Sequence, residues 1–452
     1  MTGRGRSWRR EFGALMSIGL PMGLTQLVQF SISTVDVLMI GRLGPEPLAG
    51  ASLGLVILYA VFLFGFGPAM AVSPMVSQAL GADPDDTAGV RRSVRMALWT
   101  IGVGVPALSI VFFFTQEIAL VLGQPPVPAA LAEPYVLALA PGLPFMVGIM
   151  ALRNFLAAIG RTRAPLLFIV MTTVLNAFLN WLLIFGHWGF PRLELVGAGV
   201  ASSVSHATGF LLLVLYIRTE HESRRFHLFR SFFKRSAVHL REVIHLSWPI
   251  GLAWTFEAML FNACVFLMGR LGVDEMAAYQ VALNVAAVAF MMPLGLSMAG
   301  SVRVGLAAGA GDTKRVRRAA GASVLACVGA IMVIAIPVMI APQRIAAFYL
   351  DATDPANATV LGLVTSFLPI AAAFAFFDAT QVAANQALRG LKDVRVPMFI
   401  TAFSYWGIGF PVSVGLGLAT PLGAVGVWWG LLAGLAVAAV LLGGRLLRLT
   451  RP

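Results

Sequence analysis

The segment IGLPMGLTQLVQFSISTVDVLMIGRLG (residues 18–44) decides the fold, because nearly the same pattern returns as LSWPIGLAWTFEAMLFNACVFLMGRLG (residues 246–272). The two segments align without a gap, so that Pro21 falls on Pro249 and Gly23 on Gly251. Further pairs follow in the same order: VRR (90–92) with VRR (316–318), RAP (163–165) with RVP (395–397), and GV (199–200) with GV (426–427). Each segment has the roughly 20 mostly apolar residues that a membrane helix needs. The sequence therefore predicts a duplicated membrane protein.

The composition supports a membrane protein and excludes several other classes. Of 452 residues, 59% are hydrophobic and 12% are charged, and the mean hydropathy is +0.86. Soluble domains carry about 25% charged residues, so neither a cytosolic enzyme nor a disordered chain fits. The net charge of +12 is spread too thinly to form a groove for nucleic acid. Cys264 and Cys327 lie in apolar runs, where small core side chains are expected.

Twelve stretches are long and apolar enough to be membrane helices, separated by loops rich in Gly, Pro and charged residues. The predicted spans are 14–41, 47–79, 92–114, 134–158, 165–186, 195–217, 243–269, 275–308, 319–341, 360–388, 396–418 and 421–444.

The distribution of basic residues predicts the orientation. If the N-terminus is cytoplasmic, all 32 Lys and Arg residues except Arg42, Arg192, Arg270 and Arg344 belong to cytoplasmic segments. This bias predicts that both termini face the cytoplasm. Because each half then has an even number of spans, both halves enter the membrane from the same side. This is the parallel type of repeat found in transporters.

The predicted organisation is an N-terminal six-helix lobe (1–218), a basic linker (219–242) and a C-terminal six-helix lobe (243–452). The linker either lies along the membrane surface, with Phe226, Phe229, Phe232 and Phe233 entering the interface, or forms a solvated loop.

Three acidic residues fall inside predicted helices: Asp36, Glu257 and Asp378. A carboxylate inside a bilayer is costly unless it faces a polar interior, so each is a candidate functional residue. Arg153, Arg303 and Arg389 are expected at cytoplasmic helix ends, where their side chains can extend to water. The compensating charge is then expected from protons, metal ions or a cationic substrate. The alternative for each acid is a permanently protonated side chain that donates a structural hydrogen bond.

Polar side chains follow the acids at helical spacing. The stripes are Gln26, Gln29, Ser33 and Asp36; Thr173, Asn176 and Asn180; Gln280 and Asn284; and Asp378, Gln381 and Asn385. Carboxylate, amide and hydroxyl oxygens suit a hard cation such as sodium, and they suit proton relays equally. The alternative for any single amide is a contact between packed helices.

Motifs for other chemistry are missing from the sequence. It contains no GxxxxGK[ST], HExxH or CxxC pattern, and its GxSxG match, GASLG (50–54), falls inside a predicted membrane helix and so forms no nucleophile elbow. ATP hydrolysis and common enzyme chemistries are therefore not indicated. We therefore expect a transporter without a cofactor rather than an enzyme. The alternatives are a lipid-linked oligosaccharide or lipid flippase, which would need a basic cavity; an intramembrane enzyme; and a membrane receptor or scaffold.

The chain resembles the multidrug and toxic compound extrusion (MATE) family, and its NorM branch more than its DinF branch. The resemblance rests on Pro21 with STVDVLMIGRLG (33–44), WTFEAMLFN (254–262), LNAFLN (175–180), FFDATQVAANQALRGLKD (376–393) and the two-lobe layout.

The resemblance implies a V-shaped pair of lobes that acts as a monomer and exports small organic cations in exchange for sodium or protons. It implies a C-lobe cation site at Glu257 and Asp378, where sodium could bind, and an N-lobe site at Asp36, Asn176 and Asn180. The chain departs from relatives at Phe374, where they often have tyrosine. It also has amides on the fifth helix, where proton-linked relatives often carry a second acid.

Overall fold

The computed structural model describes residues 3–350 and 354–451, and the regular secondary structure of these residues is helical, with turns and short loops between the helices. The helices are α1 (Gly3–Gly41), α2 (Pro45–Ala82), α3 (Thr87–Leu108), α4 (Thr115–Val121), α5 (Pro126–Leu139), α6 (Leu143–Ala158), α7 (Arg163–Phe185), α8 (Glu194–Thr219), α9 (His221–Arg224), α10 (Ala237–Leu271), α11 (Val273–Gly309), α12 (Thr313–Ile340), α13 (Pro342–Tyr349), α14 (Ala358–Gly390), α15 (Arg395–Ala402), α16 (Phe410–Leu418) and α17 (Gly423–Leu449). Short 3-10 turns occupy Ser109–Phe114, Ala140–Gly142, His187–Gly189 and Pro355–Asn357, and a π-helical segment occupies Phe403–Gly409.

Within these residues, twelve helical stretches are long and apolar enough to cross a membrane. Three of them are composite: Thr87–Val121, Pro126–Ala158 and Arg395–Leu418. The last contains the π-helical segment, which ends just before Pro411. Because proline has no backbone N–H, it interrupts the regular hydrogen-bond ladder at this point. The predicted all-α fold with twelve spans is confirmed, and α1 begins earlier than predicted, at Gly3 rather than near residue 14.

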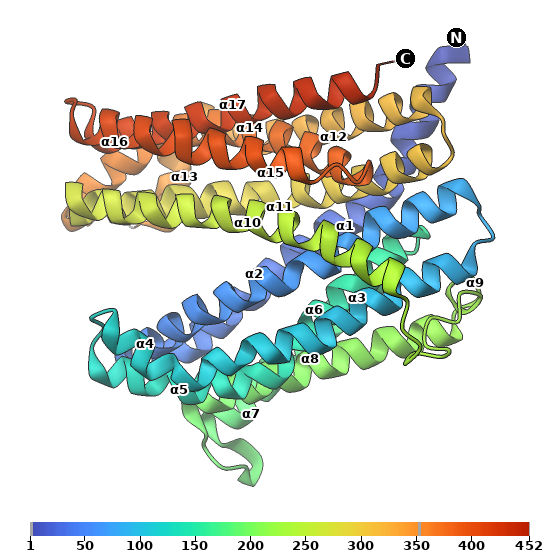
Figure 1. The fold of residues 1–452 in the computed structure, drawn as a ribbon. Coiled ribbons are helices and arrows are strands. Elements are labelled where there is room, and N and C mark those ends of the chain that lie inside the picture. Colours follow the sequence, from blue (N-terminus) through green and yellow to red (C-terminus); the bar gives the residue numbers. More distant parts are fainter. Residues whose placement is uncertain (1–2, 351–353, 452) are drawn as a thin grey trace. The chain divides into compact units, whose positions relative to one another are not determined.

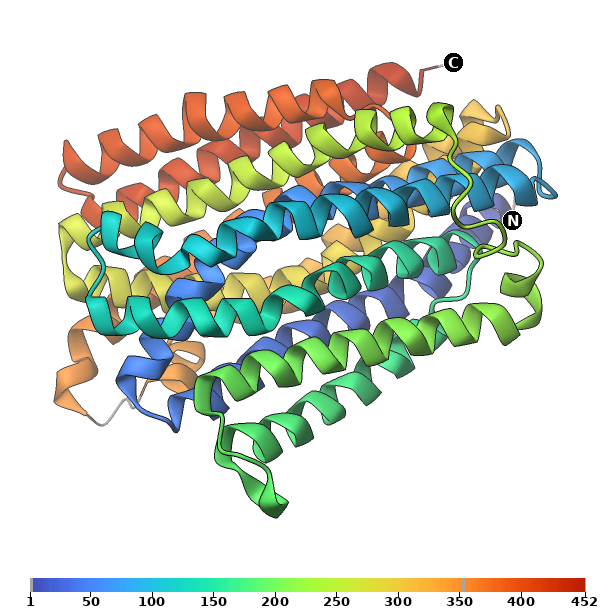
Figure 2. The same cartoon turned by 60° about the horizontal axis from the view of Figure 1, so that its bottom comes forward.

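The chain forms two compact units whose borders lie inside helices. We call Leu27–Gly251 the N-unit, and Met1–Gln26 together with Leu252–Pro452 the C-unit. In the N-unit, α7 and α8 run side by side, and in the C-unit α14 packs against α11 and α17 (Figures 1 and 2). The compact units divide within α1 and α10, so they do not test the predicted lobe borders at residues 218 and 243. Those borders describe the sequence repeat and stay a prediction.

Close contacts at glycines explain why α1 and α10 are each divided between the two units. In the C-unit, a Cβ atom on Gly295 of α11 would lie 2.2 Å from the backbone nitrogen of Gly23 of α1. In the N-unit, a Cβ atom on Gly67 of α2 would lie 2.3 Å from the carbonyl oxygen of Ser247 of α10. Both pairs need a residue without a side chain at the crossing. The start of α1 is thus packed onto α11, and the start of α10 onto α2.

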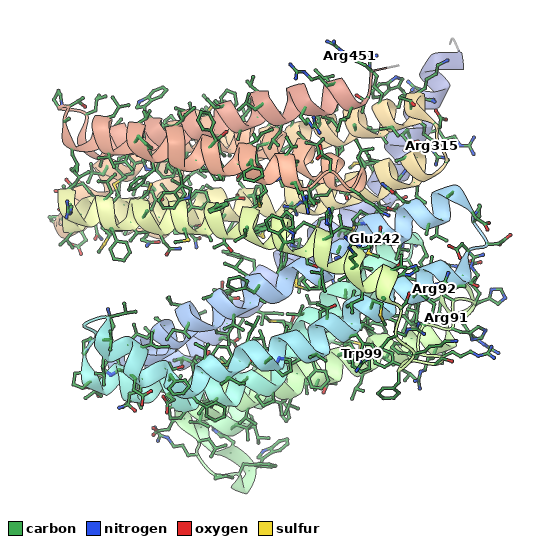
Figure 3. The ribbon with its side chains drawn as sticks, in the orientation of Figure 1. Arg91, Arg92, Trp99, Glu242, Arg315 and Arg451 are labelled. Carbon is green, nitrogen blue, oxygen red and sulfur yellow. The ribbon has the colours of Figure 1, made fainter. Side chains whose placement is uncertain are left out.

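The basic linker is attached to α3 of the N-unit. Nη1 of Arg95 donates a hydrogen bond to the carbonyl oxygen of Ser231 (2.9 Å), and Nε1 of Trp99 donates to that of Phe232 (2.9 Å). Figure 3 marks Trp99 on α3, with Arg91 and Arg92 nearer the start of the same helix. Phe226 is 0% exposed, and its ring packs edge-on against that of Phe155. The expectation that Phe226 enters the membrane interface is therefore wrong, because its ring completes the core of the N-unit.

Replacing Phe226 with Ala should destabilise the folded protein by about 3–5 kcal/mol, the usual cost of removing a buried aromatic ring. Phe233→Ala is the matched control, because Phe233 belongs to the same linker but is 81% exposed. Denaturant unfolding of the purified protein in detergent measures both. Equal stabilities for the two variants would show that the linker is not part of the folded core.

Candidate functional site

The N-unit brings Asp36 of α1 together with the two amides of α7. Nδ2 of Asn180 donates hydrogen bonds to Oδ1 of Asp36 (2.6 Å) and to Oδ1 of Asn176 (3.2 Å). Nδ2 of Asn176 in turn donates to the hydroxyl of Ser202 on α8 (3.2 Å). The two amides are buried, and within the described residues the Oδ1 atom of Asn180 has no hydrogen-bond partner. The site thus offers a carboxylate next to an unused amide oxygen.

Two tyrosines near this group were not predicted from the sequence. The Tyr59 hydroxyl lies beside Ser33 and within electrostatic range of Asp36. Tyr135, which is buried, also lies within electrostatic range of Asp36. They come from α2 and α5, so no periodicity within a single helix links them to Asp36. The only signal in the sequence was a hydroxyl inside an apolar run.

Gln29 contacts Arg153 of α6. Nη1 of Arg153 donates a hydrogen bond to Oε1 of Gln29 (2.8 Å), and Arg153 is 8% exposed. The expectation that Arg153 extends to water at a helix end is therefore wrong. Its side chain is enclosed by α1, α6, α7 and α8 within the N-unit.

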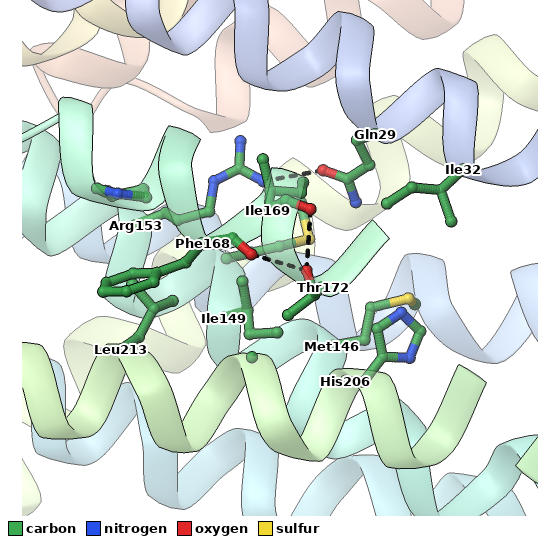
Figure 4. A pocket seen from close by; sticks show the side chains of 13 residues that line it. Gln29, Ile32, Met146, Ile149, Arg153, Phe168, Ile169, Thr172, His206 and Leu213 are labelled. Carbon is green, nitrogen blue, oxygen red and sulfur yellow. Dashed lines mark hydrogen bonds between the residues drawn. The ribbon is translucent and has the colours of Figure 1, made fainter. Parts of the chain in front are cut away.

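Arg153 and Gln29 line a cavity of about 50 Å³ in the N-unit (Figure 4). The rest of the lining is mainly apolar, with Thr172 and His206 as polar members; the apolar side chains include Met146, Met150, Ile149 and Phe168. A cavity needs about 10–15 Å³ to hold one water molecule, so several waters or a small chemical group fit here. His206 lines this cavity and is only partly buried.

The C-unit brings the other two acids together. Asp378 of α14 is 5% exposed, and it interacts electrostatically with Glu257 of α10. Among the residues that the structure describes, Oδ1 of Asp378 has no hydrogen-bond partner. Gln381, one turn further along α14, is buried and donates from Nε2 to the hydroxyl of Tyr405 (3.0 Å). Asn385 is buried on the same helix.

Tyr405 is the residue of this group that the sequence analysis missed. It is fully buried in the π-helical segment and lies within electrostatic range of both Glu257 and Asp378. Phe374, where a hydroxyl was expected to be lost, packs against the rings of Phe261 and Trp428 instead. A neighbouring span thus places a tyrosine hydroxyl in the vicinity of the acid pair, where it accepts the hydrogen bond from Gln381.

Arg389 also differs from the prediction. It was expected at a water-exposed helix end, but it is 6% exposed and interacts electrostatically with Glu257. Its guanidinium lies 6.0 Å from the ring centre of Trp254. The expectation that Arg389 extends to water at a helix end is therefore wrong. Helix α14 continues to Gly390, so Arg389 is within its last turn and remains packed.

Three other residues of the predicted polar stripes are exposed. Gln280 and Asn284 of α11 are exposed, and Oδ1 of Asn284 accepts a hydrogen bond from the hydroxyl of Tyr349 (3.2 Å). Ser33 is exposed. Across residues 3–350 and 354–451, no three His, Cys, Asp or Glu side chains are grouped to hold a metal ion. A cation at Glu257 and Asp378 would therefore need further ligands such as amide and hydroxyl oxygens.

The two halves of the chain both match one family model. The MatE model matches residues 21–182 and again residues 249–414. The chain belongs to the MatE family. The two MatE matches begin at Pro21 and Pro249, the same prolines that align in the internal repeat.

Relatives with NorM names support this membership. "Probable multidrug resistance protein NorM" of Rhizobium meliloti (strain 1021) is 41% identical over 449 residues, which cover 98% of this chain and 95% of that protein. "Multidrug resistance protein NorM" of Burkholderia vietnamiensis is 36% identical over 436 residues, covering 95% and 92%. The predicted membership of the NorM-like branch is confirmed.

Solved MatE structures show the same fold. The eukaryotic MATE transporter AtDTX14 superposes with a TM-score of 0.83 at 22% identity, covering 98% of this chain and 99% of that one. A mutant of the Vibrio cholerae MATE transporter VcmN gives a TM-score of 0.88 at 20% identity, covering 98% of both chains. The chain is thus a multi-pass membrane protein with the MATE fold, in a family of transporters rather than of enzymes.

Proposed function

We propose that the protein is a secondary antiporter that exports cationic, amphipathic organic compounds in exchange for sodium or protons. The observation that carries the proposal is Asp378, a buried carboxyl group beside a second one, Glu257, with one oxygen left without a hydrogen-bond partner in the described chain. Buried carboxylates need positive charge close by. A cation that enters and leaves can supply it. The names of the NorM relatives support multidrug efflux.

Exchange requires that the ion and the drug favour different states of the protein. If cation binding to the acids stabilises one state and drug binding the other, each ligand drives the release of the other. We place the coupling cation at Glu257 and Asp378, and a second site at Asp36, Asn176 and Asn180. The distribution of Lys and Arg supports a bacterial cytoplasmic membrane location with both termini inside. We propose that the monomer is the working unit.

Transport by purified protein in liposomes tests this proposal. Ethidium uptake or efflux should accelerate when a sodium gradient or a proton gradient is imposed, and the two gradients are applied separately. Acceleration by either gradient supports antiport and identifies the ion. The same rate of ethidium transport with and without each gradient would contradict antiport.

A flippase for lipid-linked sugars is the second candidate, because Arg153 gives the N-unit cavity the basic side chain that such a protein would use. Against it, Arg153 is already bonded to Gln29, and the cavity of about 50 Å³ is small. The same liposomes decide between the two. Gradient-independent movement of a labelled anionic lipid, without ethidium transport, would favour the flippase.

A further inference from the structure

The cavity of the N-unit has one strongly polar wall. Arg153 of α6 is 8% exposed, and its Nη1 atom donates a hydrogen bond to Oε1 of Gln29 (2.8 Å). Figure 4 shows the two side chains together at the cavity, with the amide nitrogen of Gln29 turned away from Arg153. Because Oε1 of Gln29 accepts this bond, the other polar atom of its amide group is a donor. The wall therefore combines a permanent positive charge with N–H donors.

The other residues of the lining contribute no negative charge. Among those that the structure describes, none is an aspartate or a glutamate, and the remaining polar members are Thr172 and His206. The hydroxyl of Thr172 hydrogen-bonds to the carbonyl oxygens of Phe168 and Ile169 on its own helix (3.0 Å each). A concave site lined by charge of one sign concentrates the opposite charge. This cavity therefore favours an anion over a cation.

The residues that follow Arg153 hold it in this wall. Asn154 is buried, and its Nδ2 atom donates a hydrogen bond to the carbonyl oxygen of Ala69 on α2 (2.8 Å). Phe155 is also buried, and its ring packs edge-on against that of Phe226. These contacts fix the rotation of α6 about its axis. The guanidinium of Arg153 is therefore kept at the cavity.

The size of the cavity limits the ligand. Its volume of about 50 Å³ is larger than the roughly 10–15 Å³ that one water molecule needs. It accommodates an ion such as chloride or a carboxylate group, but not a whole amphipathic drug. An anion here forms charge-assisted hydrogen bonds with the guanidinium, which are roughly twice as strong as neutral ones. The apolar side chains around it strengthen the attraction, because they lower the local dielectric constant.

We propose that Arg153 and Gln29 form a binding site for a small monovalent anionic group. The group is either a free anion such as chloride or the carboxylate end of a larger organic compound. The site uses none of the acidic residues of the protein, so the inference does not rest on the proposed antiport. It goes beyond the export of organic cations, because it gives the protein a second ligand of the opposite charge.

Binding of labelled anions to the purified protein tests the proposal. Radioactive chloride and radioactive benzoate are titrated separately in detergent, in a buffer whose own anion is a bulky sulfonate. The wild type should bind one chloride or one benzoate per chain, with saturation. Arg153→Gln should weaken this binding at least about tenfold, because the charge is lost. Arg153→Lys should weaken it less, because it keeps the charge and loses only the fork of donors.

Two further variants complete the set. Gln29→Leu removes the amide donors and should also weaken anion binding. Arg95→Gln is the matched control, because Arg95 is a buried arginine of the same unit that does not line the cavity. It should bind the anion as the wild type does.

The two labels separate the two sources of the anion. Chloride binding that excess bromide displaces and benzoate does not would assign the site to a free halide. Benzoate binding that Arg153→Gln weakens would assign it to the carboxylate of an organic compound.

Two results would overturn the site. One is a wild-type protein that binds neither anion with saturation, in which case the cavity holds water alone, and this result does not depend on the stability of any variant. The other is anion binding that Arg153→Gln leaves unchanged. Loss of gradient-driven ethidium transport in wild-type liposomes would instead overturn the antiport, whatever the anion binding.

Discussion

Glu257→Gln and Asp378→Asn should each reduce gradient-driven ethidium transport at least about a hundredfold, which corresponds to about 2.7 kcal/mol. Each substitution keeps the size of the side chain and removes its negative charge. Asp378 is buried and interacts with Glu257, so the loss of either charge removes the reason for a cation to enter. Without cation binding, the gradient no longer drives drug release.

The measurement is initial ethidium flux in liposomes at equal protein content, with resistance of cells that express each variant as a second readout. Asp274→Asn is the control, since Asp274 is an exposed acid in the first turn of α11. It should transport at the wild-type rate. Wild-type flux in both Glu257→Gln and Asp378→Asn would refute the C-unit ion site.

Asp36→Asn should cause a comparable loss in the N-unit, again at least about a hundredfold. Oδ1 of Asp36 accepts the hydrogen bond from Nδ2 of Asn180 at 2.6 Å. An asparagine side chain can still accept that bond through its own oxygen, so the substitution removes the charge and leaves the contact in place. A loss of transport would therefore be due to the charge and not to disturbed packing.

Glu46→Gln is the control for this unit, because Glu46 is exposed in the first turn of α2. Thermal unfolding in detergent should show that Asp36→Asn is as stable as the wild type. Full transport by a stable Asp36→Asn variant would mean that Asp36 is a protonated structural donor, the alternative that the sequence left open.

The candidate site was partly predictable because helical periodicity is a local property. Asn176 and Asn180 lie four residues apart, and the bond between them follows from that spacing. The bond from Asn180 to Asp36 crosses between two helices, and the sequence suggested it only through the family resemblance. Gln381 was also predicted, but its partner Tyr405 was not, because their hydrogen bond joins two different spans and no periodicity within one helix links them.

The sequence by itself determined the twelve spans, the internal repeat and the three acids within the helices. These features are local, because hydropathy and charge are properties of short stretches of chain. Only the tertiary structure decided that Arg153 and Arg389 are buried, that Phe226 is a core residue, and that α1 and α10 are each shared between the two units. These features depend on how helices rotate and pack against partners distant in sequence. A long side chain at a helix end can reach water or turn inward to an acid or amide, and only the neighbouring helices settle which of the two it does.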